Sequence, residues 1–171
     1  MSDREGPLIQ RAWAMPPVAG ATFTVKPIKA LLVHYVEKKP NDWLDPFAGH
    51  NSPADFTNDL NPECQTLYHM DACEFLMKMK TVQPLFDGAL LDPPYTIHQT
   101  NHLYSGYGLR KPISLAKDLL VDMIRPGGIV ICFGFNSGGM GLKRGFEMIE
   151  VLLVCHGGSH NDTIVTVERK K

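Results

Sequence analysis

The stretch DGALLDPPYT, residues 87–96, runs a short apolar segment directly into an acid, two prolines and a tyrosine. Gly88 to Leu91 are small or apolar, which predicts a short buried strand. That strand must end abruptly, because proline has no N–H for the next ladder bond. A carboxylate, a stiff turn and an aromatic ring therefore lie together at one strand end.

Strands and helices alternate along the chain on both sides of this stretch. Apolar residues at helical spacing predict three helices, in KPIKALLVHYVEKK (26–39), DACEFLMKMK (71–80) and PISLAKDLLVDMIRPGG (112–128). Pro126 and the two glycines after it are expected to stop the third helix before the next strand. Short apolar runs predict strands in DWLDPFAG (42–49), TLYHM (66–70), PLFDGALL (84–91), GGIVICFGF (127–135), GFEMIEVLLVCHGG (145–158) and NDTIVTVERKK (161–171). This order predicts an α/β fold with a mostly parallel sheet and an antiparallel strand at its carboxyl end.

The length of 171 residues suits one domain with one sizeable core. Residues 22–171 are expected to form this domain, and residues 1–21, rich in Pro and Gly, to form an irregular N-terminal segment. No apolar run has the length of a membrane span, and no signal peptide is recognised, so a cytoplasmic protein is expected. Four cysteines without a CxxC pair predict buried, reduced thiols and no metal site.

Two acidic motifs follow strands, DPFAG (45–49) and DPPY (92–95). In an open α/β sheet, ligands bind at the carboxyl ends of the strands. The two motifs are therefore expected to share one site.

The motifs and their order resemble a class I methyltransferase that uses S-adenosylmethionine and methylates the amino group of adenine in DNA. DPPY resembles that family's catalytic motif, DPFAG its first cofactor motif, and FTVKPIKALL (23–32) the helix before it. TNDLNP (57–62), HMDACEFL (69–76) and RPGGIVICFG (125–134) resemble further motifs of the core. The similarity covers roughly residues 22 to 170 and is strongest to small adenine-specific methylases of phage-associated type, which also carry a WAMP segment like residues 13–16.

The chemistry explains why such residues are needed. The amino lone pair of adenine is delocalised into the ring, so a carboxylate and a carbonyl that accept its two hydrogens favour a nucleophilic nitrogen. Transfer of an activated methyl group then depends on positioning and on charge stabilisation. Asp92 and the Pro93 carbonyl would hold the amine, Pro94 would stiffen the turn, and Tyr95 would stack on a base taken out of the duplex.

The resemblance also assigns cofactor-binding residues. Asp45 and Gly49 would meet the methionine end of S-adenosylmethionine, with Pro46 and Phe47 nearby, although Asp45 also suits a turn cap. The remaining cofactor-binding residues are Lys26 near the cofactor carboxylate, Asp59 on the ribose hydroxyls, and Asp71 with Ala72 near the adenine amine. Each of the three polar residues also has a structural alternative. Lys26 could simply face water, Asp59 could lie in a solvated turn, and Asp71 could be a helix N-cap.

The sequence departs from the family pattern in two places. The glycine expected two positions after Gly49 is Asn51, and only seven residues, 50–56, separate DPFAG from TND. A parallel crossover normally needs a dozen residues or more, so the first crossover helix is expected to be shortened or missing.

No segment is large enough for a separate target-recognition domain. The residues best suited to contact DNA lie in the loop after DPPY, together with Tyr95: Asn101, Tyr104, Tyr107, Arg110 and Lys111. The same loop suits a lid over the cofactor equally well. The resemblance implies DNA as a partner, with the adenine flipped out, and leaves a homodimer open.

The motifs also bear on the alternatives to adenine methylation in DNA. Attack on a ring carbon of cytosine is disfavoured, because that reaction needs a cysteine nucleophile in a comparable turn. Methylation of the cytosine amino group stays possible, although such enzymes more often carry serine in place of Asp92. Methylation of adenine or guanine in RNA is the nearer enzymatic alternative. A catalytically silent subunit that binds the cofactor within a methyltransferase complex is an alternative of a different class, and the intact Asp92–Tyr95 motif argues against it.

Overall fold

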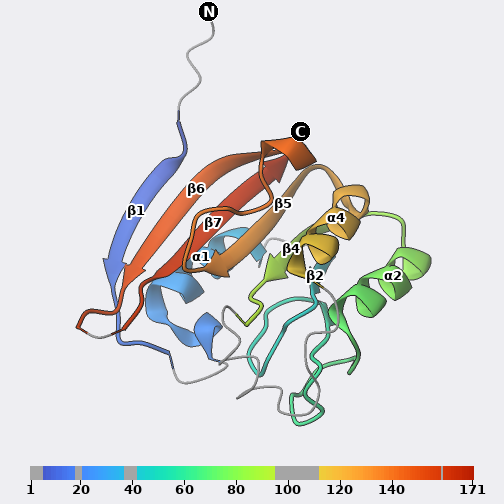
Figure 1. Ribbon diagram of the computed structural model, residues 1–171, viewed down its shortest axis with the longest axis horizontal. Coiled ribbons are helices and arrows are strands. Elements are labelled where there is room, and N and C mark those ends of the chain that lie inside the picture. The colour runs from blue at the N-terminus through green and yellow to red at the C-terminus, as the bar shows by residue number, and fades with distance from the viewer. Residues whose placement is uncertain (1–5, 18–20, 37–41, 95–111, 159) are drawn as a thin grey trace, which may run out of the picture.

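A computed structural model describes residues 6–17, 21–36, 42–94, 112–158 and 160–171. Within these ranges one seven-stranded sheet has the order β1-β6-β7-β5-β4-β2-β3 (Figure 1). The strands are β1 (Leu8–Trp13), β2 (Trp43–Asp45), β3 (Phe56–Thr57), β4 (Phe86–Leu91), β5 (Ile124–Gly134), β6 (Phe146–Cys155) and β7 (Thr163–Lys170). The helices are α1 (Lys26–Val36), α2 (Ala72–Val82) and α4 (Ile113–Met123), with short 3-10 turns η1 (Thr22–Thr24) and η2 (Leu142–Arg144).

The pairing confirms the predicted α/β architecture. Every neighbouring pair is parallel except those made by β7, which runs antiparallel to both β5 and β6. The predicted helices at 26–39, 71–80 and 112–128 correspond to α1, α2 and α4. Among the described residues, none of the helices combines the length and the apolar character that a membrane span needs.

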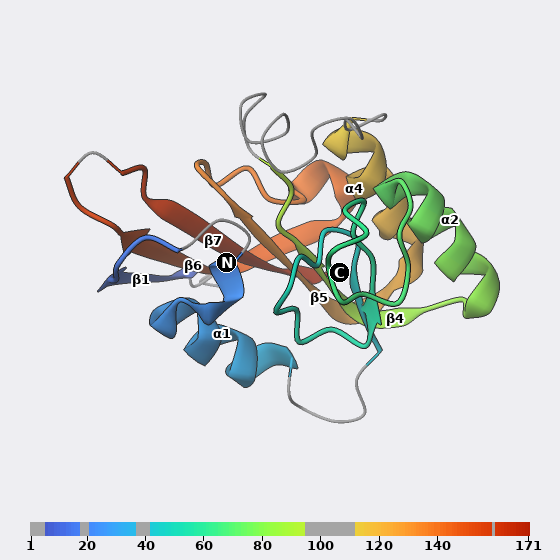
Figure 2. The same cartoon turned by 90° about the horizontal axis from the view of Figure 1, so that it is seen from below.

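The helices cover the two faces of the sheet separately, as Figure 2 shows. The apolar stripe of α1, including Ile28 and Leu32, packs on side chains of β4, β5, β6 and β7. The opposite face packs against α2 and α4 through residues such as Phe75 and Leu120, which are fully buried. All four cysteines are buried and free, as predicted.

Two expectations about local structure are wrong. Leu8–Trp13 lies inside the segment expected to be irregular, yet it forms strand β1 because its backbone pairs in parallel with Glu150 to Cys155 of β6. Pro126 and the two glycines after it were expected to separate a helix from a strand. Instead β5 already begins at Ile124, and the extra residues are taken up by a register shift opposite Phe86 and Gly88 of β4.

The missing crossover helix is confirmed. Between β2 and β3, residues 46–55 form turns and irregular structure, without a helix. The brief strand expected at 66–70 is reduced to a single parallel bridge between Asn58 and Tyr68. The sheet therefore ends in very short strands on this side.

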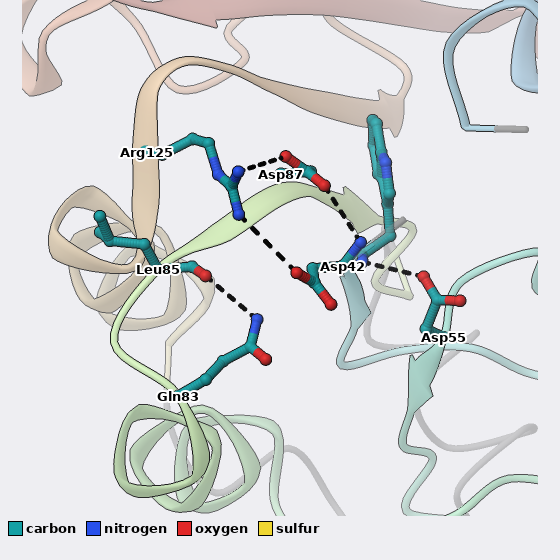
Figure 3. Close-up of polar contacts among 7 residues, drawn as sticks. Asp42, Asp55, Gln83, Leu85, Asp87 and Arg125 are labelled. Atoms are coloured by element: carbon teal, nitrogen blue, oxygen red, sulfur yellow. Dashed lines mark hydrogen bonds and ion pairs between the residues drawn. The ribbon is translucent and has the colours of Figure 1, made fainter. Parts of the chain in front are cut away.

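Polar contacts tie together the amino ends of β2, β4 and β5 (Figure 3). The Arg125 guanidinium lies 3.1 Å from the Asp87 carboxylate and 3.7 Å from that of Asp42. Asp87 also accepts a hydrogen bond from the Asp42 N–H, and Asp55 accepts one from the Trp43 N–H. These contacts lie where the strands begin, at the end of the sheet opposite the DPFAG and DPPY motifs.

Gly88 is required in β4 because two neighbouring strands approach it closely. A Cβ at this position would lie 2.5 Å from the Ile129 carbonyl oxygen and 2.7 Å from the Trp43 ring. Trp43 is 3% exposed and packs between the sheet and α1, so it has little room to move.

Gly88→Ala is therefore expected to destabilise the protein by about 1–3 kcal/mol, as other overpacked cores are. Chemical unfolding of both proteins measures this difference. Gly6→Ala is the matched control, because no atom lies within 4 Å of a Cβ at residue 6. Equal unfolding free energies for Gly88→Ala and the parent would contradict the packing described here.

Candidate active site

The DPFAG and DPPY motifs lie at the carboxyl ends of neighbouring strands. Asp45 is the last residue of β2, and Asp92 directly follows β4. Because Leu44 pairs with Ala89, Asp92 lies two residues beyond the position opposite Asp45, about 7 Å further along the strand direction. The chain passes outward from β2 to β3 and then returns to the other side of β2 with β4. Such a reversal of strand order marks the ligand crevice of open α/β sheets.

Asp45 is fully buried and holds the start of its own loop. One carboxylate oxygen accepts a hydrogen bond of 2.6 Å from the Ser52 hydroxyl, and the other accepts one of 3.0 Å from the Phe47 N–H. Burial raises the pKa of Asp45 well above its ordinary value, against the opposing effect of these two hydrogen bonds. The negative charges of Asp92 and Asp59 raise this pKa further.

The loop after β2 is fastened to the loop after β3. Gly49 has a φ of 55°, which suits glycine, and its N–H donates to Asp59 Oδ2 at 2.9 Å. Asp59 Oδ1 accepts from the Asn61 N–H at 2.8 Å, and the Ala48 N–H donates to the Asn58 carbonyl at 2.9 Å. These bonds hold the backbone in place where a crossover helix is missing.

Asp59 therefore has a defined structural role in addition to its predicted one. It lies just beyond the carboxyl end of β3 and is 2% exposed. Contact with the ribose hydroxyls of the cofactor stays a prediction.

Asp71 is the N-cap of α2. Its side chain accepts from the N–H groups of Cys73 at 3.0 Å and Glu74 at 3.4 Å, and Ala72 begins the helix behind it. The structural alternative for Asp71 is thus realised, while contact with an adenine amine stays a prediction. Both residues are buried.

Asn58 is a site residue that the sequence reasoning missed. Its fully buried side chain donates to the carbonyls of Pro46 at 3.1 Å and Met70 at 3.0 Å, and accepts from the Met70 N–H. It therefore joins the loop after β2 to the start of α2. The only signal in the sequence is an amide residue directly after a strand, in TND.

The remaining predicted residues divide into those that the structure describes and those that it does not. Pro46 and Phe47 are buried in the loop after β2, and Pro93 and Pro94 are partly buried after Asp92. Lys26 is exposed at the first residue of α1. That end of α1 lies near the carboxyl edge of the sheet, because the preceding Phe23 packs on Phe133 of β5 with ring centroids 5.2 Å apart. Six predicted residues lie outside the described ranges: Tyr95, Asn101, Tyr104, Tyr107, Arg110 and Lys111.

The main functional groups described at the carboxyl ends of the strands are four carboxyl groups, those of Asp45, Asp59, Asp71 and Asp92. Carboxylates accept hydrogen bonds from hydroxyl and amino groups and stabilise positive charge, so this set suits a cationic ligand with hydroxyl groups. Among the described residues, no three His, Cys, Asp or Glu side chains are arranged to hold a metal ion.

Comparison with solved structures shows the class I methyltransferase fold. The chain is similar to 1,6-didemethyltoxoflavin-N1-methyltransferase from Burkholderia thailandensis, with a TM-score of 0.55, 18% identity and coverage of 85% of this chain and 77% of that one. It is also similar to TrmN from Thermus thermophilus, with a TM-score of 0.51, 18% identity and coverage of 86% and 49%. The chain thus spans about half the length of TrmN. No protein-family model and no curated protein sequence matches the chain.

Proposed function

We propose that this protein transfers a methyl group from S-adenosylmethionine to the exocyclic amine of adenine in DNA. The observation that carries the proposal is the position of Asp92 beside Asp45, at the carboxyl ends of two neighbouring parallel strands where the strand order reverses. In this proposal Asp45 lies on the cofactor side of the site, and Asp92 lies on the side from which the substrate would enter. The DPPY resemblance supplies the reaction type.

The residues present fit the cofactor. The acids suit its ammonium and sulfonium groups and its ribose hydroxyls, and the Gly49 turn lets backbone approach closely. The Burkholderia protein of the same fold was crystallised with S-adenosylhomocysteine, which supports a related cofactor here. When bound, S-adenosylmethionine would supply a methyl group already activated by positive charge on sulfur.

The protein's own task is then to prepare the amine. Asp92 would accept one amine hydrogen and the Pro93 carbonyl the other, which orients the nitrogen lone pair toward the methyl group. Positive charge grows on the nitrogen during transfer, and a fixed carboxylate in a site that excludes water stabilises it. The partly buried position of Asp92 is consistent with this role.

Methylation of defined nucleic acids tests the substrate. Purified protein is incubated with isotope-labelled S-adenosylmethionine and duplex DNA, with single- and double-stranded RNA of the same base order, and with DNA in which hypoxanthine replaces adenine. Digestion and mass spectrometry of the nucleosides are expected to find label in N6-methyladenine of DNA only. Label in RNA alone would favour the RNA alternative. Cofactor binding without label in any substrate would favour the silent subunit.

A further inference from the structure

Strand β1 leaves one side of its backbone unpaired within the described residues. It is the last strand of the sheet and pairs only with β6. Leu8, Gln10 and Ala12 line a groove of about 430 Å³ against α1, so Ile9, Arg11 and Trp13 point to the other face of the sheet. Leu8, Ile9 and Trp13 are 57%, 74% and 68% exposed. An apolar edge of this length is a template for pairing with another strand.

The usual protections of an edge strand are weak here. Natural edges carry lysines, prolines, bulges or inward charges, whereas β1 contains a single charged residue, Arg11. Its guanidinium is turned back onto its own chain, with Nε donating to Cys155 Sγ at 3.2 Å and Cζ lying 5.3 Å from the Trp13 ring centroid.

The strand is nevertheless fixed to its own domain. Gln10 Nε2 donates to Glu150 of β6 at 2.7 Å, and the Tyr35 hydroxyl of α1 donates to the same carboxylate at 2.6 Å. Glu150 is 6% exposed, so this joint between β1, β6 and α1 is mostly shielded from water. The pairing edge is therefore preformed in the single chain.

We infer that β1 pairs with β1 of a second copy of this chain in an antiparallel, two-fold dimer. The opposite edge of the sheet is β3, which has two residues and cannot pair with the six of β1. A head-to-tail row of copies, in which β1 of one copy pairs with β3 of the next, is thus excluded. In a two-fold dimer, β1 of each copy covers the free edge of β1 of the other.

The charges indicate the register. A two-fold axis at Arg11 would set two guanidinium groups directly opposite each other, which is destabilising. An axis at Gln10 places each Arg11 opposite Ile9 of the other copy, with Leu8 opposite Ala12 on the α1 side. We therefore place the axis at Gln10.

Two consequences follow from this geometry. The paired strands run in opposite directions, so the carboxyl edges of the two sheets, and with them the two candidate sites, face opposite ways. The interface is built from one strand and its side chains, below the typical area of about 800 Å² per partner. We therefore expect a concentration-dependent dimer with a dissociation constant on the order of micromolar.

Sedimentation velocity over about 1 to 200 µM is the test. The parent is expected to shift from its monomer mass of 19.0 kDa to twice that mass. Ile9→Lys, which opposes the introduced lysine to Arg11 of the other copy, is expected to weaken the dimer at least tenfold. Leu142→Lys, at a position 72% exposed on η2, is the matched control and should dimerise like the parent. Circular dichroism verifies that both variants are folded.

A charge exchange tests the register. In Ile9→Lys combined with Arg11→Glu, each introduced lysine would face an introduced glutamate across the axis at Gln10, and dimerisation is expected to return. A parent that stays monomeric at all concentrations, or a dimer that Ile9→Lys leaves unchanged, overturns the inference. Failure of the double variant to restore the dimer overturns the Gln10 register.

Discussion

Asp92→Ala is expected to lose methyl transfer by on the order of a hundredfold or more while cofactor affinity stays within a few-fold. The carboxylate is proposed to hold the amine hydrogen and to stabilise the charge that grows on nitrogen, and alanine does neither. Asp92 follows β4, whereas the Asp45 loop on the other side of the crevice is fixed by Ser52, Phe47 and Asp59. Single-turnover methylation of duplex DNA and calorimetric titration of the cofactor measure the two effects separately.

Asp122→Ala is the control for this experiment. Asp122 is a largely exposed carboxylate on α4 that pairs with Lys80 at 3.2 Å, so its loss removes the same charge without touching the crevice. Its methylation rate should match the parent. If Asp92→Ala retains the parent rate, Asp92 has no part in the chemistry, whatever the substrate proves to be.

The sequence was sufficient to predict the alternation of strands and helices and the missing crossover. The helical spacing of apolar residues predicts α1, α2 and α4, and the length of the apolar segments predicts the closing β6–β7 pair. Both signals are clear because each of these elements buries one continuous apolar face. The seven residues between DPFAG and TND are too few for a helix and a return, which is a simple limit of chain length. The structure accordingly has turns there.

Strand β1 could not be found in the same way. Five of its six residues are exposed, so it shows no alternation of buried and exposed positions, and proline and glycine follow soon after it. It is a strand because β6 offers a free edge and because Glu150 accepts a hydrogen bond from Gln10. Both partners are about 140 residues away in sequence, where local propensity carries no information.

The candidate site was partly predictable for a related reason. Motifs at the ends of adjacent parallel strands must meet at one edge, so Asp45 and Asp92 could be brought together from strand assignment alone. Asn58 could not, because its role is a set of bonds to the backbone of Pro46 and Met70. Any residue with an amide side chain after a strand has the same local sequence signal.

Cofactor affinity is expected to rise with pH, by up to tenfold per pH unit, until the pH passes the pKa of Asp45 in the free protein. Burial raises this pKa, and the charges of Asp92 and Asp59 raise it further, so the free protein keeps the Asp45 proton above the ordinary range for a carboxyl group. Asp45 would release this proton when the positively charged cofactor binds beside it. Titration calorimetry in buffers of different ionisation enthalpy measures the proton released.

The effect of the Asp45 pKa on folding stability runs in the opposite direction: stability falls with rising pH, whereas cofactor affinity rises. A carboxyl group whose pKa is raised by folding binds its proton more tightly in the folded than in the unfolded state. Its contribution to folding stability is therefore favourable at low pH and is lost as the pH rises through the raised pKa.

Asp45→Asn is the variant that tests whether Asp45 causes the pH dependence of cofactor affinity. Asparagine keeps groups able to bond with the Phe47 N–H and the Ser52 hydroxyl but cannot titrate. This variant should bind the cofactor with a weaker, nearly pH-independent affinity. If its affinity follows pH as steeply as the parent's, another group titrates, and Asp92, which directly follows the neighbouring strand β4, is the next to replace.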